Sequence, residues 1–225
     1  MAVVLSPPRL SVEGTDLSEL LRRLEGRPVV DRFQLGLAGP PGVGKSTLAR
    51  VLVEQLRSRA AVVPLDGFHL ADVELERQGL LGRKGAPETF DGWGYAALLD
   101  RLRKQPDHTV YAAGFERDLE QPIAGAVPVA PDVDVVVTEG NYLLLDLPQW
   151  RAARDQLDEV WYVDNAADLR RERLVARHVA HGKEAAAAVR WVEEVDGPNA
   201  DLVSVSRRRA DLVVDVTGWT GGRRR

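Results

Sequence analysis

The stretch Gly39-Pro40-Pro41-Gly42-Val43-Gly44-Lys45-Ser46-Thr47 matches the pattern G-x-x-x-x-G-K-[ST] of a phosphate-binding P-loop. An apolar run, Phe33 to Ala38, precedes it, and apolar residues follow it at helical spacing. In such a strand-to-helix turn the backbone N–H groups and the helix N-terminus face phosphate oxygens. The predicted nucleotide-binding residues are Gly39, Gly42, Val43, Gly44, Lys45, Ser46 and Thr47. Lys45 is expected at the β- and γ-phosphates, and Ser46 on Mg²⁺.

The composition narrows the class of protein. The chain has 225 residues, a net charge of −4 and no cysteine. These numbers give no reason to expect nucleic-acid or membrane binding, and they exclude disulfides, cysteine-metal sites and a thiol nucleophile. We find neither a signal peptide nor a membrane-spanning run, which favours a cytoplasmic enzyme. A homodimer stays open as the assembly state.

Buried strands alternate with helices along the chain. The expected fold is therefore a three-layer α/β P-loop NTPase fold, with a mainly parallel five-stranded sheet and a helical lid. We predict one domain over residues 1–225, with an N-terminal helix at 16–25 and a lid at about 166–198. At the two ends we expect an irregular lead-in from Met1 to Glu13, a Thr15 helix cap and a frayed tail from Gly221 to Arg225. In the middle of the chain we expect a loop or hairpin from Phe115 to Pro131 and a strand from Val133 to Thr138 that is closed by Glu139.

Two carboxylates follow predicted strands, at the sheet edge where α/β proteins bind ligands. Asp66 could accept the proton of an attacking hydroxyl, and Glu139 could hold Mg²⁺ or contact substrate. Each also has a structural explanation, as a helix-capping or turn residue at a strand end.

Further candidates lie in a helix and in loops. Arg170, Arg173, Arg177 and His181 share one stripe of a predicted helix, typical of a lid that neutralises phosphoryl charge, although a solvated face would look the same. We predict Arg173 and Arg177 as catalytic lid residues beside Asp66 and Lys45. The predicted acceptor-binding residues are His69, Lys84, Arg117 and Glu139, and Arg83, Thr89 and Asp91 are weaker candidates. The predicted metal ligands are Ser46 and Glu139.

The order of motifs resembles that of a known kinase family. The P-loop is followed by Asp66-Gly67-Phe68-His69, by Lys84-Gly85-Ala86-Pro87-Glu88-Thr89-Phe90-Asp91 and by Glu139-Gly140-Asn141. This order resembles the kinases that include type I pantothenate kinase, uridine kinase and phosphoribulokinase. Asn199 and the run Arg209 to Leu212 look like the closing segment of that family. The resemblance implies Asp66 as catalytic base and ATP and Mg²⁺ as cofactors.

The resemblance implies transfer of the ATP γ-phosphate to a small-molecule hydroxyl. The stretch from Tyr111 to Pro122 lacks the Tyr-Ser-His pattern of pantothenate kinases, so a nucleoside or sugar is the expected acceptor and pantothenate the alternative. The chain looks most like a nucleoside/nucleotide kinase or fructokinase-like branch. A GTPase or ATPase switch, or a metallochaperone, is the alternative of another class. It is weakened because Asn165-Ala166-Ala167-Asp168 lacks the lysine of N-K-x-D, although Asp91-Gly92-Trp93-Gly94 fits D-x-x-G.

Overall fold

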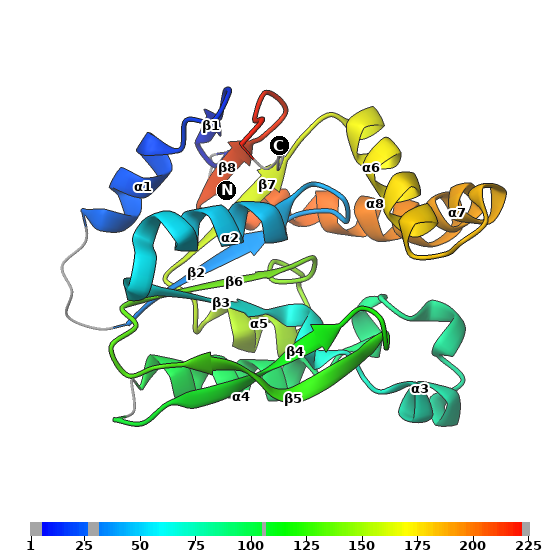
Figure 1. Cartoon of the computed structure of the whole chain (residues 1–225), viewed down its shortest axis with the longest axis horizontal. Coiled ribbons are helices and arrows are strands. Elements are labelled where there is room, and N and C mark those ends of the chain that lie inside the picture. The colour runs from blue at the N-terminus through cyan, green and yellow to red at the C-terminus, as the bar shows by residue number, and fades with distance from the viewer. Residues whose placement is uncertain (1–5, 27–31, 105–106, 222–225) are drawn as a thin grey trace, which may run out of the picture.

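The P-loop strand lies inside a six-stranded sheet in the computed structural model, which describes residues 6–26, 32–104 and 107–221. The strand order is β1-β8-β7-β2-β6-β3, and every neighbouring pair is parallel. The strands are β1 (Arg9–Ser11), β2 (Phe33–Ala38), β3 (Ala60–Pro64), β6 (Val135–Gly140), β7 (Glu159–Asp164) and β8 (Leu212–Asp215). Helices cover both faces, so the predicted three-layer arrangement is confirmed (Figure 1).

The prediction of five strands and an irregular lead-in was wrong. Arg9 to Ser11 form a sixth strand, β1, in register with residues 213–215 of β8. Strand β1 has only three residues and follows two prolines, so its pattern carries almost no local signal. Part of the predicted lead-in (1–5) and of the predicted tail (222–225) lies outside the described residues.

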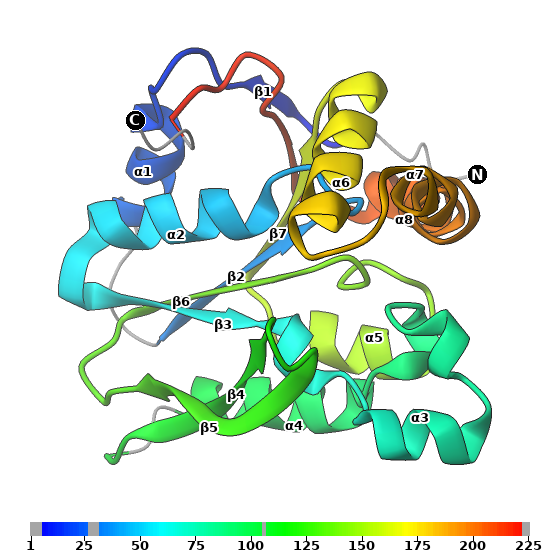
Figure 2. The ribbon, with the colours of Figure 1, turned by 45° about the vertical axis from the view of Figure 1, so that its right-hand side comes forward.

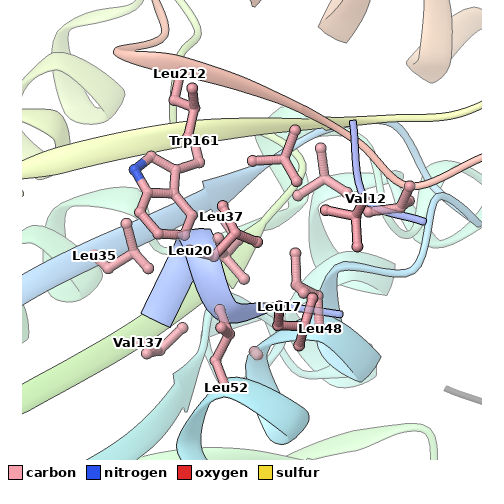
Figure 3. Packing of buried hydrophobic residues seen from close by; sticks show 14 of the residues in the cluster. Val12, Leu17, Leu20, Leu35, Leu37, Leu48, Leu52, Val137, Trp161 and Leu212 are labelled. Atoms are coloured by element: carbon pink, nitrogen blue, oxygen red, sulfur yellow. The ribbon is translucent and has the colours of Figure 1, made fainter. Parts of the chain in front are cut away.

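One face of the sheet packs against α1 (Ser18–Glu25) and α2 (Lys45–Leu56) (Figure 3). Trp161 of β7 lies fully buried among leucines of both helices and of β2. The predicted Thr15 cap was wrong: the helix begins at Ser18, and Asp16 Oδ1 accepts the Ser18 N–H at 2.8 Å. Burial of these apolar side chains stabilises the P-loop, because α2 continues directly from it.

The opposite face is covered by α4 (Gly92–Arg103), α5 (Pro148–Arg154) and α8 (Gly197–Ser206). Tyr95 and Trp150 are fully buried there. The segment predicted as a lid, called the lid segment below, contains α6 (Ala167–Ala180), α7 (Ala185–Trp191) and a π-helical turn (Val192–Asp196) that leads into α8. Helix α8 was not predicted, because Gly197-Pro198 indicates a break, yet proline fits the first turn of a helix.

A hairpin of β4 (Val110–Glu116) and β5 (Gln121–Val129) lies beside the main sheet. The prediction allowed a hairpin from Phe115 to Pro131, but the observed hairpin begins earlier, at Val110. Helix α3 (Asp72–Gln78) lies at the same end of the molecule as the turn of this hairpin. Figures 1 and 2 show α6 and α7 on one side of the P-loop, and α3 with the hairpin on the other. Helices α3, α6 and α7 stand beyond the carboxyl ends of the parallel strands, where α/β sheets bind ligands, and the hairpin runs alongside the sheet with its turn toward the same end. Within the described residues, no helix combines the length and apolar character that a bilayer crossing needs.

Candidate active site

The P-loop wraps tightly around the start of α2. Gly42 has a φ of 76°, and a Cβ there would stand 2.7 Å from Leu174 Cγ of α6. Only glycine fits this position, because a side chain would both strain the backbone and push the lid helix away. The loop is therefore shaped by its glycines to leave backbone N–H groups open toward a ligand.

Lys45 is buried and directed back into the loop. Its Nζ donates to Gly39 O at 2.9 Å, to Pro40 O at 3.0 Å and to Asn141 Oδ1 at 2.7 Å. Burial lowers the pKa of Lys45 to about 8, and the negative charges of Glu139 and Asp66 oppose that shift. The Lys45 amine is thus held at the centre of the site, and a bound anion would stabilise its charged form.

Ser46 and Glu139 form the adjoining contact. Ser46 Oγ donates to Glu139 Oε1 at 2.8 Å. The prediction that the strand ends at Thr138 and that Glu139 follows it was wrong: Glu139 lies within β6, because its backbone still pairs with Leu37 on one side and Pro64 on the other. The carboxylate is 5% exposed, and burial together with the charge of Asp66 raises its pKa. A cation placed beside Glu139 would relieve that cost.

Asp66 follows β3 in a short 3₁₀ turn (Leu65–Phe68). The turn packs tightly on the hairpin: a Cβ on Gly67 would stand 2.2 Å from Ala113 O. Arg117 Nη2, from the end of the hairpin, lies 3.7 Å from Asp66 Oδ2. The packing holds Asp66 firmly in place, while its carboxylate stays partly open to solvent.

His69 has a defined protonation pattern. Its Nδ1 lies 2.8 Å from Asp66 O, and a carbonyl only accepts, so Nδ1 carries the proton. The ring lies between Phe90 and Phe115, with centroid distances of 4.0 and 4.9 Å. Burial lowers the pKa of His69, so the imidazole is neutral and Nε2 is an acceptor at the cavity wall.

The loop candidates divide into two groups. Lys84 lines the cavity, and its Nζ donates to Asp72 Oδ1 at 2.6 Å and to Glu120 O. The weaker candidates Arg83, Thr89 and Asp91 do not line it. Arg83 pairs with Glu88 at 2.6 Å, the buried Thr89 Oγ1 donates to Ala86 O, and Asp91 caps α4 by accepting the Gly94 N–H. These three residues shape the loop, and the D-x-x-G match is a helix cap.

The lid stripe is only partly directed at the site. Arg173 lies against the P-loop: its Nη1 is 3.7 Å from where a Cβ on Gly44 would stand, and 3.4 Å from Val43 O. Arg177 also lines the cavity, and its charge contributes to the lowered pKa of Lys45. Arg170, in contrast, donates to Asn165 O at 2.8 Å and does not line the cavity.

These elements enclose a cavity of about 960 Å³. The predicted site residues that line it are Gly42, Gly44, Lys45, Ser46, Thr47, Asp66, His69, Lys84, Arg117, Glu139, Arg173 and Arg177. Two of the predicted nucleotide-binding residues do not line it: Gly39 contributes its carbonyl to Lys45, and the Val43 side chain is buried in the core. The structure therefore brings nearly all of the dispersed candidates together.

The sequence analysis missed several lining residues. Aromatic Phe90, Phe115 and Trp191 line the cavity, as do Asn141, His178 and Asp196. Asn141 belongs to the motif Glu139-Gly140-Asn141, but the sequence analysis assigned no specific role to it. His178 lies next to the predicted stripe, one residue after Arg177, so helical spacing alone did not place it on the cavity side.

The residues present fit a nucleotide with its metal ion. A buried ammonium, two lid guanidinium groups and a glycine-shaped loop suit a polyphosphate. Ser46 and Glu139 supply the hard oxygen donors that Mg²⁺ prefers. Across the described ranges, no group of three or more His, Asp or Glu side chains could hold a metal. Such sparse protein ligation is typical of Mg²⁺ sites that substrate phosphates complete.

Comparisons with known proteins agree with this geometry. No protein-family model matches the chain. A solved structure, the "putative fructose transport system kinase" from Silicibacter sp., is 39% identical with a TM-score of 0.81, over 89% of this chain and 99% of that one. A "putative uridine kinase" from Schizosaccharomyces pombe is 33% identical over 77% of this chain and 79% of its own length. A pantothenate kinase from Nocardioides sp. is 30% identical, over 84% and 67% respectively.

Fold, cavity and relatives lead to one family. The relatives match over most of both chains, and the P-loop, Asp66 and Glu139 converge on the cavity as in a nucleotide-dependent transferase. The chain belongs to the P-loop kinases that include uridine kinase and pantothenate kinase, and it is a phosphotransferase that acts on a hydroxyl-bearing small molecule.

Proposed function

We propose that this protein transfers the γ-phosphate of ATP to a hydroxyl of a nucleoside or a sugar. One observation carries the proposal: Lys45, Glu139 and Asp66 lie close enough to influence one another electrostatically within a single cavity. That arrangement places a phosphate-binding cation, a metal-binding carboxylate and a proton acceptor within reach of one reacting centre.

The phosphate end of the cavity would bind and orient ATP. The P-loop N–H groups hold the phosphates, and Lys45 exchanges its carbonyl partners for phosphate oxygens. Ser46 and Glu139 would hold Mg²⁺, which when bound supplies neutralising charge to the β- and γ-phosphates. Arg173 and Arg177 then meet the charge that develops on the equatorial oxygens during transfer.

The acceptor end would position the hydroxyl. Asp66 accepts the hydroxyl proton, the hydroxyl oxygen forms a bond to the γ-phosphorus, and the bond to the β–γ bridging oxygen breaks. The electron pair of that bond leaves with ADP. Arg117, 3.7 Å from Asp66 Oδ2, pairs with the carboxylate and would orient it between turnovers.

The lid would exclude water. Helices α6 and α7 border the cavity with Arg173, Arg177 and Trp191, and the hairpin borders it with Phe115 and Arg117. Closure between them would remove bulk water, which otherwise competes with the acceptor hydroxyl.

The names of the relatives support a nucleoside or sugar acceptor. One relative is named a uridine kinase and another a fructose transport system kinase, and both match over more than three quarters of their length. The Nocardioides pantothenate kinase is 30% identical over 84% of this chain, and two other pantothenate kinases are 37% and 38% identical but over only 50% of it. Pantothenate is therefore kept as the alternative acceptor.

A screen of ATP consumption tests the proposal. The purified protein is incubated with ATP, Mg²⁺ and, one at a time, nucleosides, hexoses or pantothenate, and phosphorylated product is identified by mass. The Lys45→Ala variant is the control for contaminating kinases. Product formed from a nucleoside or sugar by the wild type and not by the variant supports the proposal. Product from pantothenate alone favours the alternative.

A further inference from the structure

A buried carboxylate from the lid faces the cavity and has no part in the chemistry described above. Asp196 ends the π-helical turn (Val192–Asp196), where the Gly197 N–H donates to Val192 O, five residues back. Pro198 has no N–H to continue the α-helical pattern, which explains the wide turn. Such π-turns occur frequently at functional sites. Here the turn leaves Asp196 8% exposed and lining the cavity.

His178 holds this carboxylate from the neighbouring helix. His178 Nε2 donates to Asp196 Oδ2 at 2.8 Å, and the two side chains are only 15% and 10% exposed. The His178 ring packs edge-on against Trp191, with a centroid distance of 6.3 Å, and this contact fixes its orientation. The hydrogen bond engages Oδ2 and leaves Oδ1 as an acceptor for a ligand.

Asp196 lines the same cavity as Asp66 and as Lys84 and Gly85 of the predicted acceptor loop. The Tyr142 hydroxyl donates to Gly85 O in the acceptor loop, and burial raises its pKa, with further contributions from the charges of Glu88, Asp196 and Asp66. Asp66 and Asp196 therefore both lie within electrostatic range of one hydroxyl. A ligand whose reacting hydroxyl meets Asp66 would reach Asp196 with its more distant groups.

The cations near these residues are engaged with other groups. Lys84 Nζ binds Asp72 Oδ1 and Glu120 O, and Arg117 pairs with Asp66. Lys183 Nζ lies over the Trp191 ring, 4.3 Å from its centroid. A carboxylate on the acceptor would have to displace one of these contacts while it approached Asp196. A hydroxyl would instead donate to Asp196 Oδ1, a charge-assisted hydrogen bond.

We propose that Asp196, oriented by His178, binds hydroxyl groups of the acceptor and selects a neutral polyhydroxylated molecule over one that bears a carboxylate. The proposal rests on the kinase function proposed above and specifies its substrate class. Asp196 is the binding residue and His178 a positioning residue. The acceptors that fit this description share a sugar ring, either as a free sugar or as the ribose of a nucleoside.

The test compares acceptor kinetics in matched variants. The wild type, Asp196→Asn, His178→Leu and His178→Gln are assayed with hexoses and nucleosides as neutral acceptors, and with pantothenate and glycerate as carboxylate acceptors. Asp201→Asn is the control, because Asp201 is an exposed carboxylate on α8, the helix that directly follows the π-helical turn of Asp196. Thermal unfolding and nucleotide affinity of each variant show whether the lid is intact.

For Asp196→Asn we expect the KM of the neutral acceptor to rise about 10- to 100-fold, the loss typical of a hydrogen bond to a charged group. The KM for ATP should stay within about twofold, and use of carboxylate acceptors should increase relative to neutral ones. His178→Leu should also raise the KM of the neutral acceptor. His178→Gln should raise it less, since the glutamine amide can donate from a position near that of Nε2.

Three outcomes overturn the proposal, and they differ in what else they affect. An unchanged acceptor KM in Asp196→Asn, or an equal change in Asp201→Asn, removes Asp196 from recognition and leaves the kinase function intact. A wild type that phosphorylates only carboxylate acceptors reverses the selectivity. A wild type that phosphorylates no acceptor in the panel contradicts the proposed function itself, and the selectivity is withdrawn with it.

Discussion

Ser46 Oγ donates a hydrogen bond to Glu139 Oε1 at 2.8 Å. This contact joins the first turn of the P-loop helix to the end of β6, across 93 residues of sequence. The two side chains are placed by adjacent parallel strands, since Glu139 pairs in register with Leu37 of β2. The contact therefore depends on the sheet, and it preassembles the two residues that we propose as metal ligands.

Glu139→Gln tests that assignment. Glutamine keeps an oxygen that can accept from Ser46 but lacks the charge that would hold a divalent cation. The Mg²⁺ concentration for half-maximal phosphoryl transfer should rise about 10- to 100-fold, as when a group supporting a metal site is lost. The measurement is a Mg²⁺ titration at fixed ATP. The control is Glu54→Gln on the exposed face of α2. An unchanged Mg²⁺ requirement would make Glu139 a structural partner of Ser46.

Nucleotide affinity should depend on the charge of Lys45. Its pKa is lowered to about 8 in the free protein, so the charge is lost as the pH rises through that value. A bound polyphosphate restores the charged form, and kcat/KM for ATP should therefore fall about tenfold per pH unit above pH 8, with kcat declining at higher pH. The exposed Lys104→Met variant should keep the same profile. A flat kcat/KM up to pH 10 would contradict the assignment.

The same shift affects stability in the absence of nucleotide. The folded protein favours neutral Lys45, whereas the unfolded chain keeps the ordinary lysine pKa of 10.5. Between about pH 8 and 10.5 the unfolded chain binds more protons at this residue, so the Lys45 contribution to the free energy of unfolding rises with pH. Denaturant unfolding at pH 7, 8 and 10 measures it, with the Lys45→Met variant as the reference. Equal pH dependence in both proteins would show that burial does not penalise this ammonium.

The lid arginines should act mainly in the transition state. Arg173→Ala and Arg177→Ala should lower kcat more than they raise the KM for ATP, because the charge they meet grows during transfer. Arg190→Ala, on the exposed side of α7, is the matched lid control. Steady-state kinetics of the three variants distinguishes the cases. A rise in the KM for ATP alone would make Arg173 and Arg177 ground-state binders, and no change in either parameter would make them surface residues.

The sequence predicted the parts of the fold that carry a local signal. The P-loop strand was predicted with its observed bounds, Phe33–Ala38, because it is a buried strand next to a strong motif. Strand β1 was missed because its stability comes from pairing with β8, more than 200 residues away, rather than from its own three residues. The Thr15 cap was wrong for a local reason, because Asp16 competes for the same backbone N–H groups.

The site was predictable where a motif or a strand end fixed the residue. Lys45, Asp66 and Glu139 follow from such positions, and the structure places all three at one cavity. Asp196 was not predictable, because its direction depends on a π-helical turn and on His178 of another helix. Helical periodicity likewise assigned Arg170 to the stripe, although its guanidinium turns away to Asn165 O.

The central claim is that Asp66 accepts the proton of the acceptor hydroxyl. The residue is held by the turn Leu65–Phe68 and lies in the same cavity as Lys45, while we propose that the nucleotide contacts come from the P-loop. Asp66→Asn keeps the size and much of the hydrogen bonding of the side chain, and it removes the proton acceptor. ATP affinity should therefore persist, and acceptor phosphorylation should fall by roughly 10²- to 10⁴-fold. The lower end is expected if the transition state is mostly dissociative.

The decisive measurement determines ATP affinity and acceptor phosphorylation in one preparation of Asp66→Asn, beside Asp72→Asn as a second carboxylate of the same cavity wall. The account predicts near-normal ATP binding with transfer reduced at least about 100-fold in Asp66→Asn, and a smaller loss in Asp72→Asn. Near-normal transfer by Asp66→Asn would contradict the claim and leave Asp66 as a turn residue. ATP affinity lost in proportion to transfer would also contradict it, and would make Asp66 part of the metal site.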